Sequence, residues 1–114
     1  VLVLQNKASV LREKDIMQPD QVTTPSRRIY FPVMMMYLDE AAAEKFYEEF
    51  ATRLNDFMGV VRNPAVLQDC IAISKHVMAR EYYKALMLSR KLIEYEDERL
   101  GHVSSGVSAG GDAG

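Results

Sequence analysis

Hydrophobic and polar positions recur with helical spacing over the longest uninterrupted stretch of the chain, residues 64–100. This stretch has no glycine, and it has no proline after Pro64, so its composition permits one unbroken helix. When the residues are projected at about 100° each, the apolar side chains gather on one broad side and most charged ones on the other. The pattern therefore predicts a long amphipathic helix over residues 63–101, which at 1.5 Å per residue is about 55 Å long.

The apolar side of this predicted helix needs a surface to cover it. Its apolar columns have the seven-residue spacing that is typical of coiled-coil-like packing. Two partners fit this pattern: the shorter upstream elements fold back over the helix, or a second copy packs along it and makes a homodimer. The residues that we expect on this partner or dimer face are Ile71, Met78, Tyr82, Leu86 and Ile93.

The beginning of the chain has the pattern of a β-hairpin over residues 1–14. Two apolar, β-branched runs are joined by Asn6, Lys7 and Ala8, which suit a short hairpin loop. Because an isolated hairpin is marginal in water, we expect the whole protein to have further sequence before Val1. The polar residues that follow, up to Val22, are interpreted as a connector.

Residues 24–38 favour a kinked helix. Thr24 suits the N-cap and Pro25 the first helical position, whereas Pro32 interrupts the pattern at a cost of about 3 kcal/mol. The competing interpretation is a buried strand that has Pro32 at an edge or a bulge.

A further helix is predicted over residues 39–58, with Asp39 as its cap. The pair Asn63 and Pro64 repeats the cap-and-proline pattern at the start of the long helix, so these two helices should run antiparallel. The tail, residues 102–114, has too few apolar side chains to offset its ordering entropy and is predicted to be disordered. The expected fold is thus α+β, a single domain of residues 1–101 with an N-terminal β-hairpin and three helices, the last long and amphipathic.

Composition and charge narrow the class of protein. The 114 residues are 48% hydrophobic and 26% charged, with a net charge of −2, which is ordinary for a soluble domain and argues against non-specific nucleic-acid binding. No apolar run is long enough for a membrane span. The single cysteine, Cys70, fits a reducing compartment, and we expect a cytoplasmic protein.

No catalytic pattern stands out. The sequence has no glycine-rich phosphate loop, no paired-cysteine metal site and no HExxH motif, and Cys70 and His76 diverge by about 120° on one helix. We therefore predict a protein that is not an enzyme and that uses no cofactor or metal.

Basic residues are the feature that suggests a ligand. Two arginines in the first turn of a helix oppose its macrodipole, and a phosphate bound there would reverse that effect. A tyrosine between basic residues on the long helix could stack a base and extend the strip. The alternative is that Arg27 and Arg28 pair with the acids of the helix at 40–56. The candidate RNA-binding residues are Lys7, Arg12, Lys14, Arg27, Arg28, Arg80, Tyr83 and Lys84.

Two long stretches of the sequence, LQNKASVLREKDIMQPDQVTTPSRRIYFPVMMMYLDE and the run from FMGVVRNP to ERL, closely resemble the FlbT family of flagellin-expression regulators. The resemblance implies a cytoplasmic protein that controls flagellin synthesis after transcription, is associated with the 5′ untranslated region of flagellin mRNA and typically promotes decay of that message. It also implies FlaF and flagellin as partners and further β-rich sequence upstream. It assigns no RNA-contacting residues, so the basic set remains a prediction from charge and context.

Two functions are expected from these observations. The first is a non-enzymatic post-transcriptional repressor that binds the flagellin mRNA leader and promotes its degradation or blocks its translation. The second is a protein-binding adaptor or chaperone-like module for flagellin or FlaF, which would act on the message indirectly through the apolar side of the long helix.

Overall fold

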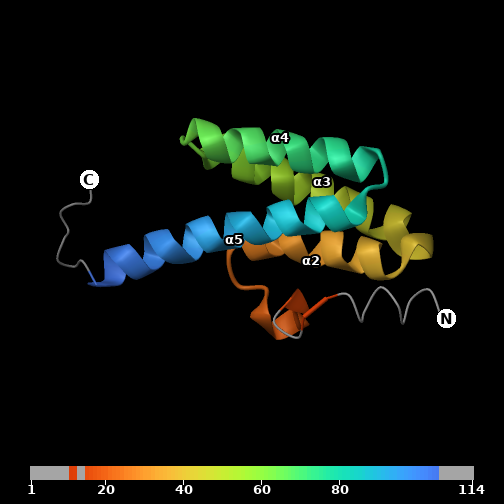
Figure 1. Cartoon of the computed structure of the whole chain (residues 1–114), viewed down its shortest axis with the longest axis horizontal. Helices are drawn as coiled ribbons and strands as arrows, with labels where there is room; N and C mark the ends of the chain where they lie inside the picture. The colour runs from red at the N-terminus through yellow and green to blue at the C-terminus, as the bar shows by residue number, and fades with distance from the viewer. Residues whose placement is uncertain (1–10, 13–14, 106–114) are drawn as a thin grey trace.

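Four α-helices make up most of the chain in a computed structural model that describes residues 11–12 and 15–105 (Figure 1). The helices are α2 (Pro25–Leu38), α3 (Ala43–Val60), α4 (Pro64–Met78) and α5 (Tyr82–Ser105). Short 3-10 turns, η2 (Pro19–Gln21) and η3 (Glu40–Ala42), precede α2 and α3. Helix α2 packs against both α3 and α5, and α4 packs mainly on α5.

The predicted α+β fold class is wrong, because the described part of the chain is helical and contains no β-strand. The β-hairpin expected at residues 1–14 lies outside the described residues except for Leu11 and Arg12. There the chain turns: the Asp15 N–H donates to the Arg12 carbonyl at 2.8 Å, and the Arg12 N–H donates to the Asp15 carboxylate at 3.2 Å. Because these bonds satisfy the local backbone, this end of the predicted second strand is not paired in a sheet.

The single helix predicted over residues 63–101 is also wrong, since it is broken between Met78 and Tyr82. Arg80 adopts a left-handed conformation with φ of 63°. Its N–H donates to the Val77 carbonyl at 3.0 Å, and the next N–H, that of Glu81, donates to the His76 carbonyl at 2.8 Å. These two bonds form a Schellman motif, which ends a helix by satisfying its last carbonyls.

The break has a packing reason. A rod of about 55 Å would exceed the longest dimension of the molecule, 50 Å, and much of its apolar side would have no cover. Folding α4 back on α5 buries Cys70 and Ile73 of one helix against the apolar side of the other. Burial of this kind outweighs the cost of one unfavourable backbone conformation, about 1–2 kcal/mol.

Three residues were predicted to cap helices, and each accepts a backbone hydrogen bond as a cap, two of them at the start of an α-helix. The Thr24 hydroxyl accepts from the Arg27 N–H at 3.4 Å, and the Asn63 side chain accepts from the Ala65 N–H at 2.8 Å. Helix α2 continues through the buried Pro32, so the helical interpretation is confirmed and the buried strand is wrong. Asp39 caps η3 rather than a full helix, and α3 begins after it.

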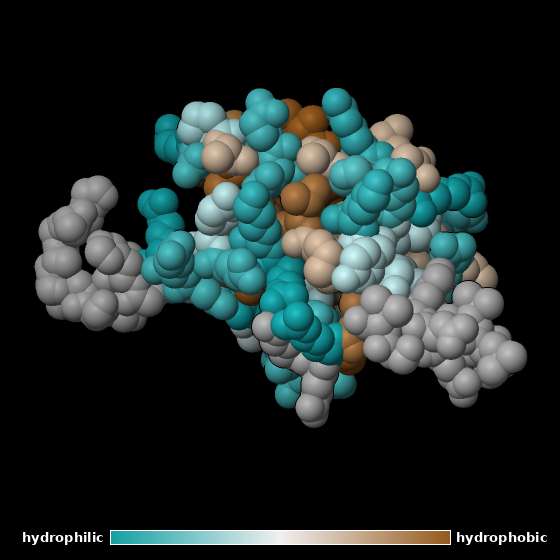
Figure 2. Space-filling view, in the orientation of Figure 1, coloured by the Kyte–Doolittle hydropathy of each residue, from teal (hydrophilic) through white to brown (hydrophobic). Residues whose placement is uncertain are grey.

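The hydrophobic core separates the residues that were predicted to form one partner face. Tyr82, Leu86 and Ile93 of α5 are buried within the chain. Ile71 and Met78 of α4 are 41% and 70% exposed. The break between the two helices is the cause, because it folds α4 back against α5 and places the apolar side of α5 inside the chain. Figure 2 shows that polar side chains cover most of one face of the molecule, with hydrophobic patches over α4 and between α4 and α5.

Two further predictions concern the C-terminal tail and membrane-spanning segments. Helix α5 extends to Ser105, so the first residues of the predicted disordered tail are helical, and residues 106–114 lie outside the described part. Among the helices that the structure describes, none combines the length and apolarity that crossing a bilayer requires.

Candidate nucleic-acid interface

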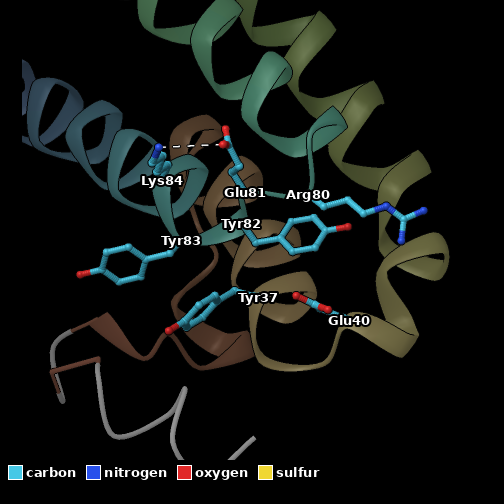
Figure 3. Close-up of a pocket in the computed structure, with 7 residues that line it drawn as sticks. All are labelled: Tyr37, Glu40, Arg80, Glu81, Tyr82, Tyr83 and Lys84. Atoms are coloured by element: carbon cyan, nitrogen blue, oxygen red, sulfur yellow. Dashed lines mark ion pairs between the residues drawn. The ribbon is translucent and has the colours of Figure 1, made fainter. Parts of the chain in front are cut away.

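A small pocket opens beside the turn between α4 and α5 (Figure 3). Its volume is about 300 Å³. The walls come from the end of α2, from η3 and from the turn with the first residues of α5. The lining residues are Tyr37, Glu40, Arg80, Glu81, Tyr82, Tyr83 and Lys84. Three of them, Arg80, Tyr83 and Lys84, belong to the basic and aromatic set predicted from the sequence.

Two tyrosine rings form one side of this pocket. The Tyr83 ring is 42% exposed, and its centroid lies 5.6 Å from that of Tyr37 with 52° between the ring planes. Tyr37 is buried at the end of α2, and this burial raises the pKa of its hydroxyl. Tilted aromatic contacts of this kind are favourable. The exposed Tyr83 ring is therefore held in place by a buried neighbour and presents a surface on which a base could stack.

Charged side chains surround the rings. Glu81 accepts a hydrogen bond from His76 Nδ1 at 2.8 Å and lies 3.9 Å from Lys84 Nζ. The hydrogen bond from His76, followed by the charge of Lys84, lowers the pKa of the Glu81 carboxyl. The exposed Arg80 extends away from Lys84 (Figure 3). The rim thus has Lys84 on the side of Tyr83 and Arg80 on the opposite side, together with the carboxylates of Glu40 and Glu81 (Figure 3).

The second predicted basic group lies at the other end of α2, and acids of α5 meet it there. Arg27 makes a two-pronged ion pair with Asp97, at 2.9 and 2.8 Å, and its guanidinium is 3.8 Å from Glu96. The hydrogen bond to Asp97 raises the pKa of Arg27. This arginine therefore already has a partner inside the fold, on α5 rather than on the helix at 40–56.

Glu96 occupies the position that we expected a phosphate to take. Its carboxylate accepts from the N–H of Ser26 at 3.4 Å and from the Ser26 hydroxyl. Free N–H groups and the helix dipole favour an anion at this position. A carboxylate from α5 supplies that anion, so the N-terminus of α2 is already occupied.

The remaining predicted residues do not join into one strip. Arg12 and Arg28 are exposed, and Lys7 and Lys14 lie outside the described residues. From Arg27 to Tyr37, α2 rises by about 15 Å at 1.5 Å per residue. The fold therefore divides the predicted RNA-binding set into two groups at opposite ends of this helix.

Sequence reasoning missed Tyr37, Glu40 and Glu81. Tyr37 continued the apolar pattern of its helix and was indistinguishable from core, although it is the ring that supports Tyr83. Glu81 stood between Arg80 and Lys84 in the sequence. Its spacing of three residues from Lys84 was a usable signal of a charge pair.

A larger groove, of about 850 Å³, lies at the far end of the helix bundle. It runs between the end of α3 and the second half of α5. Val60 at its edge is 72% exposed. None of the five residues predicted as the partner face lines this groove. The apolar lining consists of Pro25, Phe57, Val60, Val61, Val66, Leu92 and Tyr95.

Comparison with known proteins assigns the sequence of this chain to a family. The chain matches the model described as flagellar protein FlbT over residues 1–100. It is 95% identical over all of its 114 residues to the flagellum biosynthesis repressor protein FlbT of Caulobacter vibrioides, covering 81% of that protein. The chain belongs to the FlbT family.

More distant members of the FlbT family match over most of the chain as well. A probable flagellum biosynthesis repressor protein FlbT of Caulobacter sp. is 88% identical over 104 residues, covering 91% of this chain and 79% of the relative. One of Rhodopseudomonas palustris is 36% identical over 100 residues, covering 86% and 75%. No solved structure matches this FlbT-family chain.

The only cysteine of this FlbT-family chain has the character of a core residue. Cys70 is fully buried in α4, and its burial raises the pKa of the thiol to about 11. At neutral pH the thiol is therefore protonated, whereas a nucleophile needs the thiolate.

Proposed function

We propose that this FlbT-family chain is a repressor of flagellum biosynthesis that binds the 5′ untranslated region of flagellin mRNA and promotes its degradation or blocks its translation. Membership of a family whose relatives are named flagellum biosynthesis repressors supports the regulatory role. The pocket at the α4–α5 turn supports contact with single-stranded RNA. The proposal assigns binding to this chain and leaves cleavage of the message to a separate nuclease.

The observation that carries the proposal is the exposed Tyr83 ring in a pocket that has Lys84 on the same side and Arg80 on the opposite side (Figure 3). Proteins recognise unpaired bases mainly by stacking them on aromatic rings, while nearby cations contact the phosphates. A loop or a single-stranded segment of the leader would place one base on Tyr83. The carboxylates of Glu40 and Glu81 lie at the same rim and disfavour a phosphate next to them, so Arg80 and Lys84 would contact the phosphates from their solvent-facing sides.

The direct test is RNA affinity after removal of the Tyr83 ring. Loss of a stacked base costs about 1–3 kcal/mol, so Tyr83→Ala should weaken binding of labelled flagellin leader RNA by roughly 5- to 150-fold in fluorescence anisotropy. Tyr47 on α3 is the matched control, since its exposed fraction, 41%, nearly equals the 42% of Tyr83. Equal affinities for Tyr83→Ala and Tyr47→Ala would remove the proposed stacking site.

The salt dependence of binding tests the two cations separately from the ring. For single strands, each phosphate contact contributes about 0.7 to the slope of log affinity against log salt. Arg80→Ala and Lys84→Ala should each lower the slope by up to about 0.7. Lys75→Ala, an exposed lysine of α4 outside the pocket, should leave it unchanged.

The apolar groove favours a second candidate, an adaptor for flagellin or FlaF that acts on the message indirectly. Exposed apolar side chains in a groove are typical of protein-binding surfaces. If this candidate is correct, Val60→Asp should abolish capture of purified flagellin or FlaF. Ile71→Asp, at an exposed apolar position of α4 outside the groove, should not. Leader-RNA binding without capture of either protein would exclude the adaptor.

A further inference from the structure

The turn between α4 and α5 carries an unusual residue at its critical position. In a Schellman motif the residue after the C-cap adopts the left-handed conformation, and that residue is most often glycine. Here it is Arg80, with φ of 63°. A side chain of this size is disfavoured in that conformation because its Cβ approaches the following carbonyl oxygen.

The same residues are suited to a helix. Residues 65–100 contain neither glycine nor proline, and Ala79, Arg80 and Glu81 are all compatible with a helix interior. The residues that flank the turn are anchored, since Tyr82 is buried and Tyr83 contacts Tyr37 of α2, but the side-chain pair that closes the turn itself is local and partly exposed. Where a Schellman motif usually has a hydrophobic contact between the flanking residues, this one has the His76–Glu81 pair at 2.8 Å, with the two side chains 29% and 46% exposed.

We propose that the α4–α5 turn is a hinge through which two copies of the chain exchange helices. In the exchanged dimer α4 and α5 of each copy form one continuous helix, and α5 of each copy packs on α2 and α4 of the other. The inference does not depend on RNA binding. Strained short turns between helices are known to favour such exchange.

The partner in the exchange is a second copy of the chain, because a second copy offers the same surface on which α5 already packs. Ion pairs connect α5 to the rest of the chain, and three of them are Lys91 to Asp69 at 3.6 Å, Arg90 to Asp15 at 3.0 Å, and Asp97 to Arg27 at 2.8 Å. All three, together with the buried contacts of Leu86 and Leu92, can re-form between copies. Only the turn changes, and the conformation that it loses is the disfavoured one.

The exchange also has a consequence for the pocket. Arg80, Glu81 and Tyr83 line it in the closed chain, and in a continuous helix the first two become helix-interior residues. The closed monomer and the exchanged dimer therefore present different surfaces at this position.

The first experiment measures the dimer association constant by size-exclusion chromatography with light scattering, after refolding at high protein concentration. Arg80→Gly should lower this constant at least about tenfold, because glycine favours the turn and disfavours the helix. Glu48→Gly, at an exposed position of α3, controls for a glycine placed in a helix away from the turn and should leave the constant close to that of the natural sequence. A chain that stays monomeric under all conditions, or an undiminished dimer of Arg80→Gly, would overturn the proposal.

The second experiment distinguishes exchange from ordinary surface dimerisation by using the Asp69–Lys91 pair. Asp69→Lys alone and Lys91→Glu alone each place like charges between α4 and α5 of one chain. In a mixed exchanged dimer both positions again hold opposite charges. We expect refolding the two variants together to give a heterodimer in preference to either homodimer by native mass spectrometry. A statistical mixture of dimers would overturn the exchange.

Discussion

The two ends of α2 differ in what the fold does with similar residues. At the N-terminal end, Arg27 and the backbone of Ser26 meet Asp97 and Glu96 of α5. At the C-terminal end, Tyr37 supports the exposed Tyr83, and Arg80 and Lys84 lie at the rim of a pocket. The sequence predicted a ligand-binding role for the cations at both ends.

The difference shows that a basic residue is less available to a ligand where the fold pairs it closely with an acid. The acids that neutralise Arg27 lie far along the chain, on a helix that the break between α4 and α5 brings back over α2. Lys84 also has an acid nearby, but Glu81 is 3.9 Å away and shared with His76. The N-terminal end of α2 therefore has a structural role, and the C-terminal end remains the candidate binding site.

The largest effect that we expect comes from removing the anion at the first end. Glu96→Ala leaves the buried Ser26 hydroxyl and the start of α2 without their acceptor, at a cost of about 2–3 kcal/mol in the free energy of unfolding. The exposed neighbour Glu98 is the control, and Glu98→Ala should change stability by no more than about 0.5 kcal/mol. Similar urea midpoints for the two variants would mean that Glu96 does not cap the helix.

Relief of backbone strain at Arg80, in the turn between α4 and α5, should stabilise the chain. Arg80→Gly places the residue suited to a left-handed conformation at φ of 63°, with an expected gain of about 1 kcal/mol in the free energy of unfolding. Urea denaturation of the monomer measures it. A loss of stability would show that the turn does not strain Arg80.

A smaller effect should follow when Arg27 is released. Asp97→Asn removes a partly exposed ion pair, which costs about 0.5–1 kcal/mol of stability. Glu96 stays 3.8 Å from the Arg27 guanidinium. If RNA is within reach, the side of the guanidinium that Asp97 held adds a phosphate contact and raises the salt slope of binding by up to about 0.7. An unchanged slope with reduced stability would confine Arg27 to a structural role.

The smallest effect concerns pH at the second end. The pKa of Glu81 is below its ordinary value of 4.5, chiefly through the hydrogen bond from His76. A depressed folded-state pKa stabilises the fold above the unfolded pKa, and that contribution is lost as the pH falls through the folded value. Carboxyl NMR titration should show His76→Ala raising the Glu81 pKa toward 4.5. No change would mean that the pair is not formed in solution.

Local patterns predicted the helix starts well and the long-range contacts poorly. Thr24 with Pro25, and Asn63 with Pro64, carry their information within a few residues, and both begin helices as expected. The break at Arg80 has no such local pattern, because the turn contains neither glycine nor proline. Burial of α4 on α5 decides it, and periodicity alone cannot distinguish one long helix from two that fold back on each other.

The candidate site was half predictable for the same reason. Arg80, Tyr83 and Lys84 are neighbours in the sequence, so their proximity needed no knowledge of the fold. The contact between Tyr37 and Tyr83, and the pairing of Arg27 with Asp97, join residues far apart in the chain. The basic strip was therefore predicted as one surface, and the structure divides it into two.

Photo-crosslinking of flagellin leader RNA to the natural chain, followed by mass spectrometry of the linked peptides, tests the central claim most directly. If the C-terminal end of α2 carries the binding site, crosslinks are expected at Tyr83 and its neighbours in the α4–α5 turn. Crosslinks confined to residues around Arg27, with none at the turn, would contradict it.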